Sequence, residues 1–132
     1  RTVVAVIGDG GFQMTLQELG TIMQFKPNVK ILILNNQFLG MVRQWQQMFH
    51  GDRHAESYVN ALPDFVKLAE AYGHVGMLIE RPADVEPALR EAFTKHKNDL
   101  VFMDFITDQT ANVYPMIAAG KGLSDMILAE DL

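Results

Sequence analysis

Glycines and a carboxylate follow one apolar segment of the chain, and two carboxamides follow the next. Segment 2–7 runs into Gly8-Asp9-Gly10-Gly11, and segment 30–34 runs into Asn35-Asn36. Both segments have the apolar, β-branched composition of buried parallel strands, whose carboxyl ends open on one ligand-binding edge of a sheet. Glycines let backbone amides approach an anion, and carboxylate and carboxamide oxygens suit Mg²⁺ bound to a phosphate. The residues therefore predict a magnesium–diphosphate site.

Two other phosphate motifs are excluded. A dinucleotide fingerprint would need glycine where Gln13 stands, and the chain contains no Gly-Lys-Ser/Thr triplet of a Walker A loop. The Asp9 carboxylate would itself repel a diphosphate, since like charges at ~4 Å cost about 4 kcal/mol at an effective dielectric of about 20. A cation between them is therefore implied. Asp9 and Asn36 are the predicted ligands, whereas Asn35 is interpreted as an ordinary strand-end turn.

The spacing resembles the GDG…NN motif of decarboxylases and carboligases that use thiamine diphosphate. Here Gly8-Asp9-Gly10 is followed by 24 residues and then by Asn35-Asn36. Other segments point to one family among these enzymes. The large, catalytic subunit of the acetolactate synthase (acetohydroxyacid synthase) family is what segments 10–19, 40–46 and 113–116 resemble. The resemblance covers essentially all 132 residues.

The resemblance implies thiamine diphosphate and Mg²⁺ as cofactors. It implies the Phe38 backbone carbonyl as a third metal ligand, and Val42 and Trp45 as walls of the substrate pocket. The catalytic glutamate of the family belongs to a pyrimidine-binding domain missing from this chain, so no catalytic residue is assigned here. The cofactor-binding residues would be Gly8, Asp9, Gly10, Gly11, Asn36, Gly40 and Met41, and the metal ligands Asp9, Asn36 and Phe38.

The resemblance also implies a reaction. The whole enzyme would condense pyruvate with a second 2-ketoacid (pyruvate or 2-ketobutyrate), with loss of CO₂, in branched-chain amino-acid synthesis. It would bind FAD in another domain, form a homodimer or higher oligomer, and take a regulatory small subunit as partner. The present chain would be inactive alone. Alternatives are another thiamine-diphosphate enzyme, such as pyruvate oxidase or glyoxylate carboligase, and a non-catalytic magnesium/phosphate-binding module.

Three groups of residues have a second interpretation. Glu18 is interpreted as the capping-box partner of Thr15 rather than as a catalytic acid. Met41, Val42 and Trp45 share a helical face that would be core in an arbitrary helix, but its position beyond the metal ligands favours an active-site wall. A zinc site at His50 and His54 is disfavoured because Gly51 interrupts the helix that would align them.

The amino-acid composition limits the classes of partner and the location that the chain can have. The chain is 48% hydrophobic and 20% charged, with a net charge of −5, so a nucleic-acid partner is not expected. It has no membrane-spanning apolar run, and the lack of cysteine agrees with a cytoplasmic location. Because it begins with Arg1 rather than Met and is within an expected strand from residue 2, we expect an amino-terminally truncated, single partial domain over residues 1–132.

Alternating strands and helices predict an α/β fold, a parallel sheet flanked by helices, in agreement with the thiamine-diphosphate-binding fold. The segment that opens at Pro63 is expected to begin its helix there, and Pro87 is expected in the first turn of another helix. The expected strands are 2–7, 30–34, 74–79 and 100–106; the expected helices are 15–25, 41–49, 63–72, 84–96 and a short one near 123–128.

Overall fold

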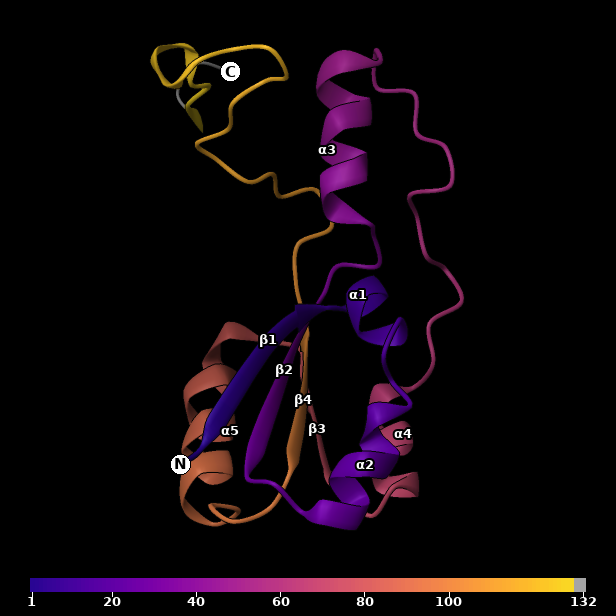
Figure 1. Ribbon diagram of the computed structural model, residues 1–132, viewed down its shortest axis with the longest axis vertical. Coiled ribbons are helices and arrows are strands. Elements are labelled where there is room, and N and C mark those ends of the chain that lie inside the picture. The colour runs from indigo at the N-terminus through magenta and orange to yellow at the C-terminus, as the bar shows by residue number, and fades with distance from the viewer. Residues whose placement is uncertain (130–132) are drawn as a thin grey trace.

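Four apolar segments pair into one parallel sheet in the computed structural model, which describes residues 1–129 (Figure 1). The spatial order is β1-β2-β4-β3, and each neighbouring pair is parallel. The last strand in the chain therefore lies inside the sheet, between the second and the third. The strands are β1 (Val3–Gly8), β2 (Val29–Asn35), β3 (Val75–Ile79) and β4 (Val101–Ile106).

Helices make every connection between the strands, as a parallel sheet requires. In Figure 1, α2 and α4 lie on one side of the sheet and α5 lies on the other. The predicted α/β architecture is confirmed. The helices are α1 (Asp9–Gln13), α2 (Glu18–Phe25), α3 (Gly40–Phe49), α4 (Phe65–Ala71) and α5 (Pro82–Thr94), and a 3-10 turn, η1, spans Leu123–Asp125.

The alternation of side chains along the strands divides the core into two clusters, one on each face. On the α2/α4 face, the ring of Phe102 packs 4.9 Å from Phe12 and 6.0 Å from Phe65, measured between centroids. On the α5 face, Met103 packs with Ala92. The first cluster comprises Phe12, Leu19, Ile31, Ile33, Phe65, Ala69, Leu100 and Phe102; the second comprises Ile79, Ala92, Val101, Met103 and Phe105.

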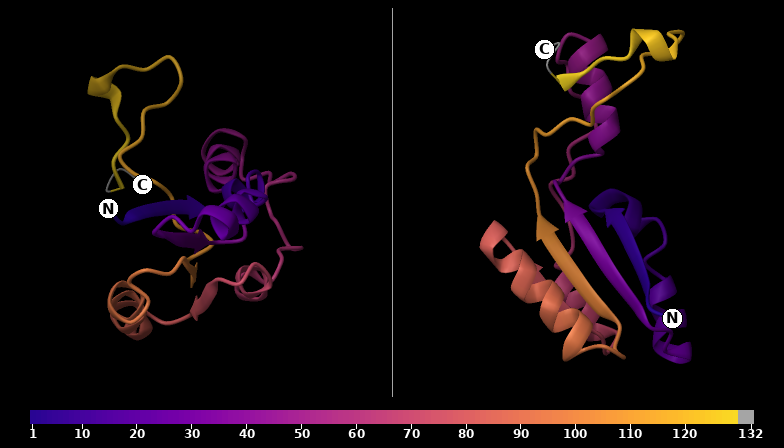
Figure 2. Two further views of the ribbon diagram at one scale, coloured as in Figure 1. Left: turned by 60° about the horizontal axis from the view of Figure 1, so that its bottom comes forward. Right: turned by 90° about the vertical axis from the view of Figure 1, so that its left-hand side faces the viewer.

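Helix α3 differs from the other helices in its surroundings. In both Figure 1 and Figure 2 it extends beyond the carboxyl ends of the strands, with the tail of the chain beside it. Its position depends on the loops that contact it, not on the faces of the sheet.

The capping box predicted for Thr15 and Glu18 is wrong. The glycine-rich segment after β1 is itself a helix, α1. Thr15 lies in the turn that follows, and its backbone carbonyl accepts the Glu18 amide at 3.0 Å. Helix α2 begins at Glu18, and its N-cap, Gln17, makes no side-chain cap hydrogen bond. Burial of Phe12 in the core explains the difference, because that contact holds the short helix despite its glycines.

Both predicted proline positions are also wrong. Helix α4 begins at Phe65, after an Asp64 N-cap whose carboxylate accepts the Lys67 amide at 3.0 Å, so Pro63 precedes the helix. Helix α5 begins at Pro82, the favoured first position for proline, and this places Pro87 in the helix interior.

Two further expectations need correction. Strand β1, expected to be covered on both faces, is at the edge of the sheet with Val3, Val4 and Val6 exposed. The helix expected near 123–128 is limited to the three-residue turn η1.

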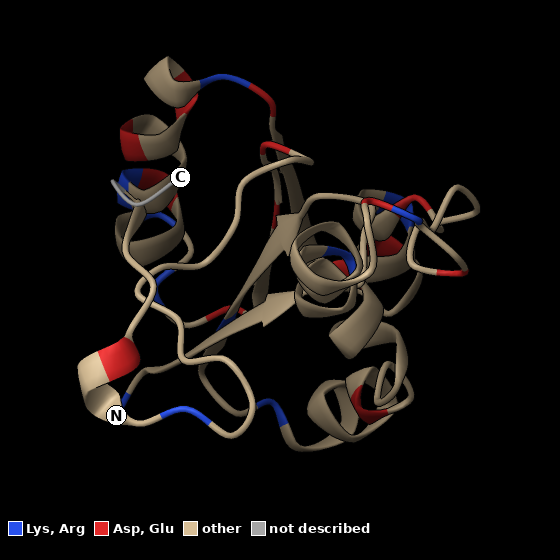
Figure 3. Cartoon of the chain, turned by 90° about the horizontal axis from the view of Figure 1, so that it is seen from above, with Lys and Arg blue, Asp and Glu red and all other residues tan. Residues whose placement is uncertain are grey.

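Charged side chains lie on the helices and in the loops, and the buried ones among residues 1–129 are Asp9, Lys30, Arg43 and Asp104. Seen from above in Figure 3, α5 carries both signs of charge. Its ion pairs, Arg90–Glu86 and Lys95–Glu91, are solvent-exposed, so each contributes little to stability. Within residues 1–129 no helix has the length and apolarity needed to span a membrane.

Candidate functional site

The Asp9 carboxylate lies buried where β1 ends and α1 begins. Its Oδ1 accepts the Gly10 amide at 2.8 Å, whereas its Oδ2 has no hydrogen-bond partner among residues 1–129. Burial raises the pKa of this carboxyl, and the backbone amides of Gly10 and Gln37 act in the opposite direction. A buried acid with a free oxygen is costly unless a cation or proton donor completes it.

The loop after β2 packs against this acid. Asn36 Oδ1 accepts the Phe38 amide at 3.1 Å, and Gln37 has a left-handed backbone with φ 59°. A Cβ on Gly10 would lie 2.7 Å from Leu39 Cδ2, and a Cβ on Gly40 would lie 3.2 Å from the Asn36 Nδ2. Glycine at position 10 therefore permits the close approach of the two halves of the motif, and glycine at position 40 permits the close approach of the start of α3 to Asn36.

The second loop to contact this region runs through Ser57. The Leu39 amide donates to the Ser57 carbonyl at 2.8 Å, the Val59 amide donates to the Gln37 carbonyl at 2.8 Å, and Phe38 forms a β-bridge with Tyr58. These backbone bonds hold the 36–40 loop against segment 57–59.

The donor set fits Mg²⁺ with phosphate oxygens as additional ligands. Asp9 Oδ2 is free, and Asn36 Oδ1 retains a lone pair after accepting one hydrogen bond. Mg²⁺ usually takes only one or two protein carboxylates. No group of three or more His, Cys, Asp or Glu side chains that could hold a metal occurs within residues 1–129, and His54 Nε2 instead pairs with Asp52 at 2.8 Å.

Helix α3 starts beside the site with its apolar and polar faces reversed relative to a core helix. Met41 and Val42 are 50% and 46% exposed, and Trp45 is half-buried with its ring 5.0 Å from that of Phe49. The buried residues of the helix are Arg43 and Gln44. Met41 and Val42 are thus not part of the core of the described chain.

A buried pair of polar residues was not predicted from the sequence. Asn35 is the last residue of β2, not a turn residue, and its Nδ2 donates to Asp104 Oδ2 at 3.4 Å. Burial raises the pKa of Asp104, and the charge of Asp9 raises it further. The available signal was one aspartate within the otherwise apolar run 100–106.

Comparison with known proteins decides the family. Residues 1–105 match the thiamine pyrophosphate enzyme family at its C-terminal TPP binding domain. The chain belongs to this family. A solved member of similar fold is the thiamine diphosphate-dependent 4-hydroxybenzoylformate decarboxylase of Rhodococcus jostii RHA1, with a TM-score of 0.72 and 29% identity over 82% of this chain and 20% of that one.

Within the thiamine pyrophosphate enzymes, the chain is similar to acetolactate synthase large subunits. It is 51% identical to that of Haemophilus influenzae over 98% of this chain and 22% of the relative, and 49% identical to the isozyme 3 large subunit of Escherichia coli over 98% and 23%. The resemblance predicted from the motifs is confirmed. The chain spans about a fifth of the length of the relatives that it matches.

Proposed function

We propose that this chain is the part of an acetolactate synthase large subunit that holds the diphosphate of thiamine diphosphate through Mg²⁺. The observation that carries the proposal is the buried Asp9 carboxylate, whose Oδ2 lacks a partner among the described residues. The adjacent Asn36 loop supplies further oxygens. The family and the high identity to acetolactate synthase large subunits support the same assignment.

Asp9 Oδ2, Asn36 Oδ1 and the Phe38 carbonyl would hold the cation. Backbone amides at Gly10-Gly11 and Gly40-Met41 would bind the phosphates. Gly8 leaves space at the strand end, since a Cβ there would meet no atom within 4 Å. When bound, the cofactor supplies the electron sink for decarboxylation and carboligation, and the protein supplies position and environment.

The exposed face of α3 would form part of the substrate pocket. Val42 and Trp45 present apolar surface beyond the metal ligands, suited to the side chain of a second 2-ketoacid. The proposed reaction condenses pyruvate with pyruvate or 2-ketobutyrate, with release of CO₂, in branched-chain amino-acid synthesis. The names of the similar proteins favour this reaction over those of pyruvate oxidase or glyoxylate carboligase.

The remaining parts of the enzyme belong to the proposal as well. The catalytic glutamate and the FAD site would lie in other domains, so the chain would be inactive alone. The whole enzyme would form a homodimer or higher oligomer and would bind a regulatory small subunit. Its proposed location is the cytoplasm.

The test measures thiamine diphosphate affinity against Mg²⁺ concentration in the full-length enzyme. Asp9→Ala and Asn36→Ala should each weaken Mg²⁺-dependent cofactor binding by at least about 10–100-fold, the loss that even an outer partner of a metal produces. Asp52→Ala, which removes an exposed carboxylate paired with His54, serves as the control and should leave the affinity unchanged. Unchanged cofactor affinity in both Asp9→Ala and Asn36→Ala would contradict the proposed metal site.

A further inference from the structure

Residues 107–116, here called the strap, come directly after β4 in the chain and contact the end of β2, the loop that follows it and helix α3. The Thr107 amide donates to the Asn35 carbonyl at 2.9 Å, and the Gln109 Nε2 donates to the Gln37 Oε1 at 2.5 Å. The strap then runs beside α3, as Figures 1 and 2 both show. It therefore connects the carboxyl edge of the sheet to a helix that extends beyond it.

Gln44 binds the strap through both ends of its carboxamide. Its Oε1 accepts the Val113 amide at 2.8 Å, and its Nε2 donates to the Val113 carbonyl at 3.0 Å. This is the pair of bonds that a neighbouring β-strand would make to Val113. The same Nε2 lies 3.0 Å from Met116 Sδ, and Gln44 is only 1% exposed.

Arg43 binds the preceding strap residues. Its Nη2 donates to the Thr110 carbonyl at 2.6 Å, to the Ala111 carbonyl at 3.3 Å and to Asn112 Oδ1 at 2.5 Å. Its guanidinium also lies 5.7 Å from the centroid of the Phe38 ring. Hydrogen bonds from a charged donor are stronger than neutral ones, so this contact fixes the first half of the strap.

The strap contacts lie opposite the proposed substrate face. At about 100° per residue, Met41, Val42 and Trp45 point to one side of α3, and Arg43, Gln44 and Gln47 point to the other. Gln47 also contacts the strap, because its Oε1 accepts a hydrogen bond from Asn112 Nδ2 at 3.0 Å. The rotation of α3 about its own axis is thus set by the strap.

We propose that Gln44 and Arg43 are positioning residues for substrate selection. By anchoring the strap, they fix the rotation of α3 and so determine how Val42 and Trp45 meet the second 2-ketoacid. This inference rests on the proposed function. It assigns no contact with the substrate to either residue and no contribution to Mg²⁺ binding.

The experiment compares variants of the full-length enzyme. Gln44→Leu leaves an apolar side chain at this buried position but removes both bonds to Val113, and Gln44→Glu keeps an acceptor for the Val113 amide. Hydrogen exchange at the Val113 amide should be about tenfold faster in Gln44→Leu and closer to wild type in Gln44→Glu. The preference between 2-ketobutyrate and pyruvate should change by about tenfold in Gln44→Leu, with the cofactor affinity within about twofold of wild type.

A second variant removes the same Gln44–Val113 contact by a substitution in the strap. Val113→Pro removes the amide that donates to Gln44 and should produce the same change in substrate preference; combining it with Gln44→Leu should add little. Gln24→Leu, the same substitution at an exposed position of α2, is the control and should change neither quantity.

The outcomes separate this inference from the proposed function. Faster exchange at the Val113 amide in Gln44→Leu, together with an unchanged substrate preference in both Gln44→Leu and Val113→Pro, would overturn the positioning role. A wild-type enzyme that makes no acetolactate, or that binds the cofactor without Mg²⁺, would instead contradict the function on which the inference rests.

Discussion

Asn35 at the end of β2 donates through Nδ2 to the Asp104 carboxylate on the neighbouring strand β4, at 3.4 Å, in the buried carboxyl edge of the sheet. Each residue keeps one oxygen, Oδ1, without a hydrogen-bond partner among residues 1–129. Two carboxylates, Asp9 and Asp104, thus share one buried region beside the proposed metal site. Their mutual repulsion adds to the cost of burial.

Asp104→Asn should stabilise the protein at neutral pH. Burial raises the pKa of Asp104 above its ordinary value of 3.8, so the folded state binds more protons than the unfolded state just above that value. Stability is therefore lost as the pH rises through the raised pKa, and an uncharged side chain avoids this loss. The variant amide can also donate to Asn35 Oδ1. We expect a gain of about 1–2 kcal/mol in the free energy of unfolding at pH 7.

Urea unfolding at several pH values measures this gain. The difference between variant and wild type should shrink as the pH falls through the raised pKa toward 3.8, because below 3.8 the wild-type carboxyl is protonated in both states. Glu70→Gln, the same change of charge at an exposed position on α4, is the control and should leave the free energy of unfolding at pH 7 nearly unchanged. A destabilised Asp104→Asn at pH 7 would mean that the charge itself is needed for stability.

Gly20 and Gly76 should respond in opposite directions to alanine. A Cβ on Gly20, in α2, would meet only the Tyr72 ring at 3.8 Å, so the substitution should stabilise by up to about 1 kcal/mol through helix propensity. A Cβ on Gly76, in β3, would lie 2.9 Å from both Val66 Cγ1 and the Val66 carbonyl. Because backbone must move there, we expect a loss of about 1–3 kcal/mol. Thermal unfolding of the two variants measures both changes in stability. A Gly76→Ala variant as stable as the wild type would mean that α4 can shift on the sheet at no cost.

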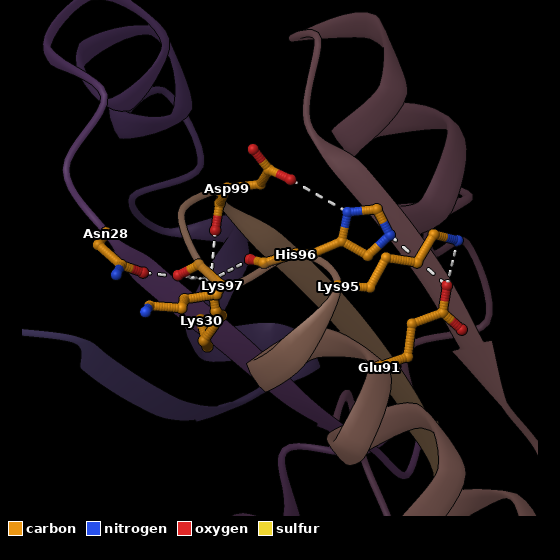
Figure 4. A network of polar contacts seen from close by, with 7 residues as sticks. All are labelled: Asn28, Lys30, Glu91, Lys95, His96, Lys97 and Asp99. Carbon is orange, nitrogen blue, oxygen red and sulfur yellow. Dashed lines mark hydrogen bonds and ion pairs between the residues drawn. The ribbon is translucent and has the colours of Figure 1, made fainter.

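Lys30 should stabilise the folded conformation of the segment between α5 and β4. Its side chain is fully buried in β2, and its Nζ donates to the carbonyls of His96 at 2.9 Å, Lys97 at 3.4 Å and Asp99 (Figure 4). Burial lowers the pKa of Lys30, opposed by the charge of Asp99, so below the lowered pKa the buried ammonium is itself a cost. Removing the donor leaves three carbonyls without it, which is the larger cost.

Lys30→Met should therefore lower the free energy of unfolding by about 2–3 kcal/mol. Lys95→Met, which removes only an exposed ion pair with Glu91, is the matched control and should cost less than about 1 kcal/mol. Urea unfolding gives both values, and hydrogen exchange should locate the loss of protection at residues 96–99. Equal effects of the two substitutions would show that the ammonium and its carbonyls contribute no net stability.

Sequence patterns predicted those parts of the structure that depend on local periodicity. The apolar runs of β1 and β2 identify strands, although β1 lies at the exposed edge of the sheet. The common direction of parallel strands brings Asp9 near the Asn36 loop. Helix α1 was missed because its glycines have low helix propensity, and only the packing of Phe12 against Phe65 and Phe102 explains it.

The unpredicted contacts of the site depend on strand order and on distant residues. The Asn35–Asp104 contact exists because β4 inserts beside β2, an order that no local pattern encodes. The Gln44–Val113 pairing joins residues 69 apart in the chain, one on a helix and one in an irregular segment. Amphipathic periodicity identified the apolar face of α3 but not the buried role of its polar face.

Trp45→Leu tests the proposed substrate face of α3. The tryptophan is half-buried, its ring lies 5.0 Å from Phe49, and its neighbours on this face, Met41 and Val42, are exposed. A large apolar surface in a pocket can favour a ketoacid with one more methylene by about 1–3 kcal/mol. Loss of that surface should reduce the preference for 2-ketobutyrate over pyruvate, and it should weaken flat aromatic inhibitors that stack in the pocket more than it lowers turnover.

The measurement is the product ratio of the full-length enzyme in mixtures of the two ketoacids, beside its melting temperature and its cofactor affinity. Phe49→Leu is the control, because it removes the ring partner of Trp45 at the far end of α3 and should change the ratio much less. Mg²⁺ and cofactor binding should stay near wild type in both variants, since neither residue belongs to the metal site. Truncation of a core tryptophan would instead cost a few kcal/mol of stability. A strongly lowered melting temperature with an unchanged product ratio would therefore place Trp45 in a packed core of the full-length enzyme rather than in its substrate pocket.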